Sequence, residues 1–137
     1  MDFKETTILY VVTAAVFFII DLLWLGVFAK GFYDKHLGGL LSEQVNWTAA
    51  VLFYIIYIGG ILVFVLIPGL KGGDSVLKIA FMGGLLGFFA YSTFDLTSLA
   101  LIRGWPVFVV WVDIVWGVVL TAAVSAVSAS ILRIISG

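Results

Sequence analysis

The sequence predicts an all-α integral membrane protein, a four-helix bundle that forms a single transmembrane domain over residues 1–137. Hydrophobic residues make up 64% of the chain and charged residues only 11%, whereas about a quarter of the residues in soluble domains are charged. The mean hydropathy is +1.25. A spanning helix needs about 20 apolar residues. Four stretches satisfy this length: residues 8–29, 47–67, 75–102 and 106–135.

The first two stretches are separated by the longest loop that the sequence predicts. The stretch 8–29 exceeds the roughly 7–15 apolar residues of a secretory signal core, so we expect a spanning helix there. Glycine and polar residues from Lys30 to Asn46 predict a loop. The stretch 47–67 then ends directly before Pro68.

The last two stretches have clear start signals. A turn rich in glycine runs from Pro68 to Asp74, and Asp74 or Ser75 is suited to cap the third helix. Pro106 suits the first turn of the fourth helix, where its missing N–H has no role. The predicted arrangement is therefore two helical hairpins joined by a short turn.

Composition excludes several classes of function and gives no reason to expect a cofactor. The absence of cysteine excludes disulfides and Cys-ligated zinc or iron–sulfur sites. A formal net charge of −1 offers no basic face for nucleic acid. The single histidine, His36, cannot form the multi-histidine sites of haem, di-iron or zinc enzymes.

Three aspartates, Asp21, Asp95 and Asp113, lie inside these apolar stretches, and no Lys, Arg or His lies near them in the same stretches to neutralise them. A carboxylate near the centre of a bilayer costs roughly 2.5–3.5 kcal/mol on insertion scales. Such residues mark functional sites in membrane proteins. We therefore take the three aspartates as candidate proton- or cation-binding groups.

The three aspartates are predicted to share one depth in the membrane. Each lies close to a residue that marks the same surface: Asp21 nine residues before Lys30, Asp95 eight before Arg103, and Asp113 eight after Trp105. At about 1.5 Å per residue they lie ~12–14 Å below that surface. A shared depth favours a common pocket, although separate acids that hydrogen-bond neighbouring helices are the alternative.

Aromatic residues accompany the acids at helical spacing. Asp21 and Trp24 are three residues apart, as are Asp113 and Trp116, so each acid shares a helix face with an indole. This repeat also suggests a degenerate duplication of one hairpin. The residues expected to line the pocket are Trp24, Tyr54, Tyr57, Tyr91, Ser98 and Trp116.

Small residues predict a close contact along the third helix. Gly83 and Gly87 have the spacing that lets two helix backbones approach. We expect Gly59 and Gly60 of the second helix to be their partner, with a packing role rather than a chemical one.

With four spans, both termini lie on one side of the membrane. The positive-inside rule favours cytoplasmic termini, by four basic residues against three. The basic residues are Lys4, Lys71, Lys78 and Arg133 on the terminal side, and Lys30, Lys35 and Arg103 on the other.

The chemistry of acids and aromatic residues without a base favours cationic occupants. Neighbouring buried carboxyl groups share and hold protons. Carboxylate oxygens also bind metal cations, and a carboxylate beside aromatic rings attracts an organic cation. All three occupants stay open at this point.

Several segments resemble a known family over nearly the whole chain: Asp21-Leu22-Leu23-Trp24-Leu25-Gly26, Asn46-Trp47, Phe53-Tyr54-x-x-Tyr57, Gly87-Phe88-x-Ala90-Tyr91-x-Thr93-x-Asp95-Leu96-Thr97 and Asp113-x-x-Trp116-Gly117. They resemble the predicted membrane proteins of domain of unknown function 2177. The resemblance implies a multi-pass protein of the bacterial inner membrane and supplies no catalytic residues. By architecture the chain is also similar to small multidrug exporters, which have one intramembrane acid instead of three.

These observations predict a small transporter or binding protein for a proton-linked cationic or polar molecule. The chain is short, so a homodimer is the expected way to enclose a pathway. The alternatives are an enzyme that modifies lipids with the acids as metal ligands or as general acid and base, and a structural or accessory subunit. Membrane lipids are expected partners in each case, and nucleic acid is not.

Overall fold

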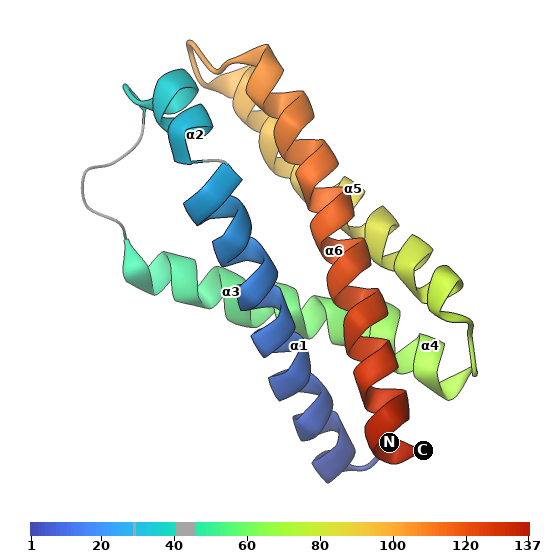
Figure 1. Cartoon of the computed structure of the whole chain (residues 1–137). Coiled ribbons are helices and arrows are strands. Elements are labelled where there is room, and N and C mark those ends of the chain that lie inside the picture. The colour runs from blue at the N-terminus through green and yellow to red at the C-terminus, as the bar shows by residue number, and fades with distance from the viewer. Residues whose placement is uncertain (29, 41–45) are drawn as a thin grey trace.

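The computed structural model describes residues 1–28, 30–40 and 46–137, except for the side chains of residues 28 and 30. Its elements are all helical (Figure 1), and two of them, η1 and η2, are single wide π-helical turns that continue an α-helix. In chain order the elements are α1 (Phe3–Leu23), η1 (Trp24–Phe28), α2 (Lys30–Leu37), α3 (Trp47–Ile61), η2 (Leu62–Leu66), α4 (Ile67–Lys71), α5 (Val76–Leu101) and α6 (Val107–Ser136).

Within the described residues, four helical segments are long and apolar enough to cross a membrane, which confirms the predicted fold class. The segments are Phe3–Val27, Trp47–Lys71, Val76–Leu101 and Val107–Ser136. The first begins at Phe3, ahead of the expected Ile8, because Asp2 caps it by accepting the Glu5 N–H at 2.8 Å.

The second segment also extends beyond the predicted boundary. We expected a turn from Pro68, but the helix continues to Lys71. Pro68 lies in the first turn of α4, directly after the π-helical turn η2, where a missing N–H is tolerated. The turn begins instead at Gly72, and Ser75 caps α5 by accepting the Lys78 N–H at 3.1 Å.

The predicted loop from Lys30 to Asn46 is wrong for its first part, which forms the helix α2. An i, i+4 contact stabilises this short helix, because the Phe32 and His36 rings lie 4.5 Å apart between centroids. Phe108 of α6 contacts both rings. Residues 41–45 of the predicted loop lie outside the described residues.

Helices α5 and α6 form the closest pair in the bundle. A Cβ atom on Gly87 would lie 2.2 Å from the Gly117 carbonyl oxygen, and one on Gly83 would lie 2.7 Å from the Thr121 carbonyl oxygen. The expected close contact therefore exists, but its partner is α6. The prediction of Gly59 and Gly60 as partner is wrong, because Cβ atoms there would meet nothing within 4 Å.

Helix α1 packs mainly against α6, and α3 crosses the other helices steeply (Figure 1). Helix α1 also contacts α3, the next spanning helix in the chain, over a smaller area than it contacts α6. Phe17 of α1 is fully buried, and its ring meets Tyr57 of α3 edge to face with centroids 5.9 Å apart.

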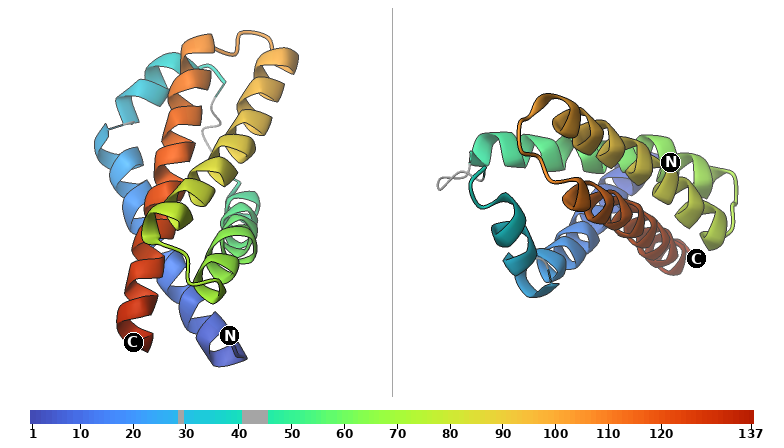
Figure 2. Two further views of the ribbon diagram at one scale, coloured as in Figure 1. Left: turned by 90° about the vertical axis from the view of Figure 1, so that its right-hand side faces the viewer. Right: turned by 90° about the horizontal axis from the view of Figure 1, so that it is seen from above.

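The two ends of the bundle carry different elements of the chain. Both termini lie at the end that carries α4, and the opposite end carries α2 and the turn between α5 and α6 (Figures 1 and 2). Helices α3 and α5 diverge from the turn that joins α4 to α5 (Figure 1).

Candidate functional site

Asp21 connects three helices. It lies near the end of α1, only 8% exposed. The Tyr54 hydroxyl of α3 donates a hydrogen bond of 3.1 Å to its Oδ2 atom. The Trp116 indole of α6 lies within hydrogen-bonding reach of the same carboxylate. This acid is buried, and polar groups of its neighbours compensate part of its lost hydration.

Asp113 of α6 is held by a residue that the sequence analysis missed. The Tyr33 hydroxyl of α2 donates a hydrogen bond of 2.7 Å to Asp113 Oδ1. Burial and the nearby charge of Asp113 raise the pKa of the Tyr33 phenol above its ordinary value. Tyr33 therefore keeps its proton and stays a hydrogen-bond donor at neutral pH.

Asp95 differs from the other two acids. It is fully buried in α5 at 0% exposure. The Asp113 carboxyl group is near enough to interact with it, but neither Asp95 oxygen has a hydrogen-bond partner of normal geometry among the described residues. A buried polar group without a partner is costly, and in native proteins it calls for an explanation.

The three acids form one cluster with Asp113 at its centre, since Asp21 and Asp95 both interact with the charge of Asp113. Among the described residues, the salt bridge of the chain lies elsewhere, between Lys78 and Asp74 at 3.4 Å. No three His, Cys, Asp or Glu side chains in that part of the chain are grouped so that they could hold a metal ion.

The two predicted Asp-x-x-Trp pairs meet at the contact between α1 and α6. The Trp24 and Trp116 rings stack with centroids 4.4 Å apart and an angle of 11° between their planes. The Trp116 indole in this stack lies beside Asp21, so that α6 contributes to the surroundings of the acid on α1. On its outer side the stack borders an apolar groove along Val115 and Val119.

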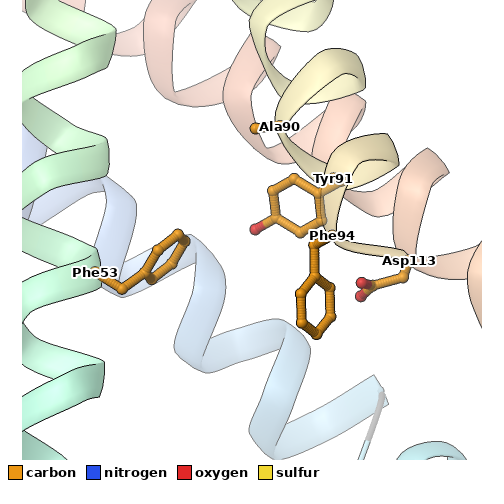
Figure 3. Close-up of a pocket in the computed structure, with 5 residues that line it drawn as sticks. All are labelled: Phe53, Ala90, Tyr91, Phe94 and Asp113. Atoms are coloured by element: carbon orange, nitrogen blue, oxygen red, sulfur yellow. The ribbon is translucent and has the colours of Figure 1, made fainter. Parts of the chain in front are cut away.

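A cavity of about 460 Å³ opens between α3 and α5 (Figure 3). Phe53 of α3 forms one wall, and Tyr91 and Phe94 of α5 form the other. The carboxyl group of Asp113 points from α6 toward the Phe94 ring (Figure 3). Ala90 completes the lining. Phe53 is 47% exposed and Phe94 58% exposed, so the cavity is open at its rim.

The sequence-predicted pocket residues fall into separate places. Asp113 and Tyr91 line the cavity. Tyr57 instead shares a hydrogen bond of 2.7 Å with Thr121 of α6. Ser98 is buried one turn after Asp95 and does not line the cavity. Tyr54 and Trp116 lie beside Asp21, and Trp24 stacks on Trp116; none of the three lines this cavity.

The sequence analysis missed four residues of the site: Tyr33, Phe53, Ala90 and Phe94. Tyr33 lies in the segment predicted as a loop, for which no depth could be assigned. Ala90 and Phe94 are one helical turn apart and adjacent to Tyr91 and Asp95. That spacing was the available signal for a wall of the cavity.

The family model described as Predicted membrane protein (DUF2177) matches residues 6–130 of the chain. No curated protein and no solved structure is similar enough to count as a match.

Proposed function

The chain belongs to the family described as Predicted membrane protein (DUF2177), and for this membrane protein we propose the binding or transport of a small cationic molecule in exchange for protons. The observation that carries the proposal is the cluster of three intramembrane carboxyl groups, of which Asp95 has no hydrogen-bond partner of normal geometry among the described residues. A bound proton or cation supplies the missing counter-charge.

The cavity supports an organic cation as the ligand. Its volume of about 460 Å³ lies in the range of small-molecule sites, roughly 300–1,000 Å³. Three aromatic rings and one carboxylate line it. Aromatic faces and a carboxylate both attract a positive charge, and the attraction is stronger where water is excluded.

The burial of Asp95 supports the link to protons. A cation at Asp113 lies beside a second acid, and two neighbouring carboxylates hold fewer protons when a positive charge is present. Cation entry therefore favours proton release, and cation exit favours proton uptake. Proton exchange of this kind is the basis of coupled transport.

An accessory role, in which the acids only hold the bundle together, has less support. That role requires acids that bond to neighbouring helices. Asp21 and Asp113 meet the requirement through Tyr54 and Tyr33. Among the described residues Asp95 has only the carboxyl group of Asp113 beside it and no partner of normal geometry, so its burial costs stability without a ligand.

We place the protein in the bacterial inner membrane with cytoplasmic termini, and a homodimer is part of this proposal. The common location of both termini at one end of the bundle supports an even number of spans. The excess of basic residues at that end supports the orientation.

Calorimetric titration of the protein in lipid nanodiscs with benzyltrimethylammonium tests the proposal. We expect saturable binding with proton release, measured by comparing buffers of different ionisation enthalpy. Asp113→Asn should weaken binding at least about tenfold, because it removes the charge at the cavity. Asp34→Asn, an exposed acid on α2, is the matched control and should bind as the wild type does.

Transport is tested in proteoliposomes with an imposed pH gradient. We expect benzyltrimethylammonium flux to follow the gradient in the wild type and in Asp34→Asn, and to cease in Asp113→Asn. Binding without flux would restrict the function to a binding protein. Equal binding by the wild type and Asp113→Asn, or no binding by either, would exclude the proposed function.

A further inference from the structure

The end of the bundle that carries both termini holds a second cavity, at the opposite end of the spans from α2 and the turn between α5 and α6. Its volume is about 300 Å³. Three helical segments contribute to it, the start of α1, the end of α4 and the end of α6. The residues that line it are Met1, Glu5, Leu70, Lys71, Leu132, Arg133 and Ser136.

Two positive side chains face one negative side chain in this lining, namely Arg133 and Lys71 against Glu5. The Arg133 guanidinium donates a hydrogen bond to the Asp74 backbone carbonyl, which fixes its position without neutralising its charge. The Asp74 carboxylate is paired with Lys78 at 3.4 Å. The cavity is therefore positive on balance and has one cation that is already oriented.

Apolar side chains around the same end show where the bilayer lies relative to the cavity. Phe3 is 88% exposed, Leu77 81% and Ile134 79%, and each belongs to a membrane-spanning segment. Such side chains are more stable against lipid chains than in water. The floor of the cavity is also apolar, with Leu132 only 4% exposed. Arg133 and Lys71 thus lie where lipid chains give way to headgroups.

We propose that this cavity binds the phosphate group of an anionic phospholipid from the surrounding membrane. The planar guanidinium of Arg133 and the ammonium of Lys71 contact the phosphate oxygens, and the Ser136 hydroxyl donates to the headgroup. The first carbons of an acyl chain lie along Leu70 and Leu132. Basic pockets between transmembrane helices bind phosphorylated headgroups by the same chemistry.

The site is independent of the aspartate cluster, and its test is carried out without an organic cation. Melting temperatures of the full chain are compared in nanodiscs of phosphatidylcholine alone and of phosphatidylcholine with phosphatidylglycerol. A lipid that binds the native state raises its melting temperature. Native mass spectrometry measures the phosphatidylglycerol retained by the protein. We expect a higher melting temperature and retained phosphatidylglycerol in the wild type.

Two variants and one control locate the effect. Arg133→Gln and Lys71→Gln should each reduce retention at least about tenfold, because each removes one of two phosphate contacts. Lys71→Gln is the cleaner variant, since Arg133 also holds the Asp74 carbonyl. Lys35→Gln removes an exposed lysine on α2 at the opposite end and should retain lipid as the wild type does.

Three results would overturn the proposal. The first is equal retention by the wild type and Lys71→Gln. The second is a loss in Lys35→Gln as large as in Lys71→Gln, which indicates a general charge effect. The third is an equal rise in melting temperature with inorganic phosphate in phosphatidylcholine nanodiscs, which indicates a site for a free anion.

Discussion

The contact between α5 and α6 and the aspartate site beside it are built on opposite principles. At the contact, Gly87 and Gly117 let two backbones meet, and the Tyr91 ring covers Gly117 so closely that a Cβ atom there would lie 2.3 Å from it. At the site, α3 stands apart from α5 and leaves an open cavity with a carboxylate in its wall. One region excludes space, and the other retains it.

The difference separates the part of the bundle that holds the fold from the part that is suited to bind. Membrane helices gain little from burying apolar surface, so close packing of small residues supplies much of their association. Helices α5 and α6 associate through such close packing of small residues. It thereby provides a rigid support for Asp95 and Asp113, whose burial is unfavourable by itself.

The largest expected effect comes from filling the contact. Gly87→Ala should lower the free energy of unfolding by about 3 kcal/mol, because its Cβ atom would lie 2.2 Å from a backbone oxygen that cannot yield. Unfolding in detergent, followed by circular dichroism, measures the change. Gly60→Ala is the control, since its Cβ atom meets nothing within 4 Å and stability should stay the same or rise. Equal effects of the two variants would show that the contact does not hold the bundle.

The glycine contact also shows how far the sequence determines the structure. The spacing of Gly83 and Gly87 predicted a close approach correctly, because it depends on one helix alone. The partner was predicted wrongly, because the choice between α3 and α6 depends on how the helices cross, and an apolar sequence does not encode that crossing locally. The four spans were predictable for the same reason as the spacing, since hydropathy is a local property.

The residues of the candidate site were likewise predictable only where the signal is local in the sequence. The Asp21, Asp95 and Asp113 carboxyl groups could be singled out because charge in an apolar segment is rare. Tyr33 could not, because its segment reads as a polar loop and its hydrogen bond to Asp113 joins residues 80 apart in sequence. Phe53 and Phe94 are aromatic residues among many others in this chain, so only the cavity between their helices distinguishes them.

The next largest effect compares two acids that differ in hydrogen bonding. Asp95→Leu should raise the free energy of unfolding by about 1–3 kcal/mol, because it replaces a buried carboxyl group that has no hydrogen-bond partner of normal geometry among the described residues by an apolar side chain. Asp21→Leu should lower it by about 1–2 kcal/mol, because the Tyr54 hydroxyl loses its acceptor. Both are measured by unfolding in detergent. A loss of stability in Asp95→Leu as large as in Asp21→Leu would assign all the acids to structural roles.

The smallest effect concerns Tyr33, which connects α2 to the site. Tyr33→Phe should lower the free energy of unfolding by about 1 kcal/mol at neutral pH, because it removes the hydrogen bond to Asp113. Tyr10→Phe is the matched control. It also removes one tyrosine hydroxyl, but that hydroxyl donates to the neutral backbone carbonyl of Ile55 at 3.0 Å and not to a carboxylate.

The stability difference between the wild type and Tyr33→Phe should depend on pH, because only the wild type carries the phenol proton at this position. The pKa of Tyr33 is raised in the folded chain, so folding favours the protonated phenol. The stability that Tyr33 contributes is therefore complete below the ordinary tyrosine pKa of about 10 and is lost as pH rises through the raised value. Melting temperatures of the wild type and Tyr33→Phe should converge above roughly pH 10. Equal melting temperatures of the wild type and Tyr33→Phe at neutral pH would mean that the ring alone, and not its hydrogen bond to Asp113, holds α2 against the site.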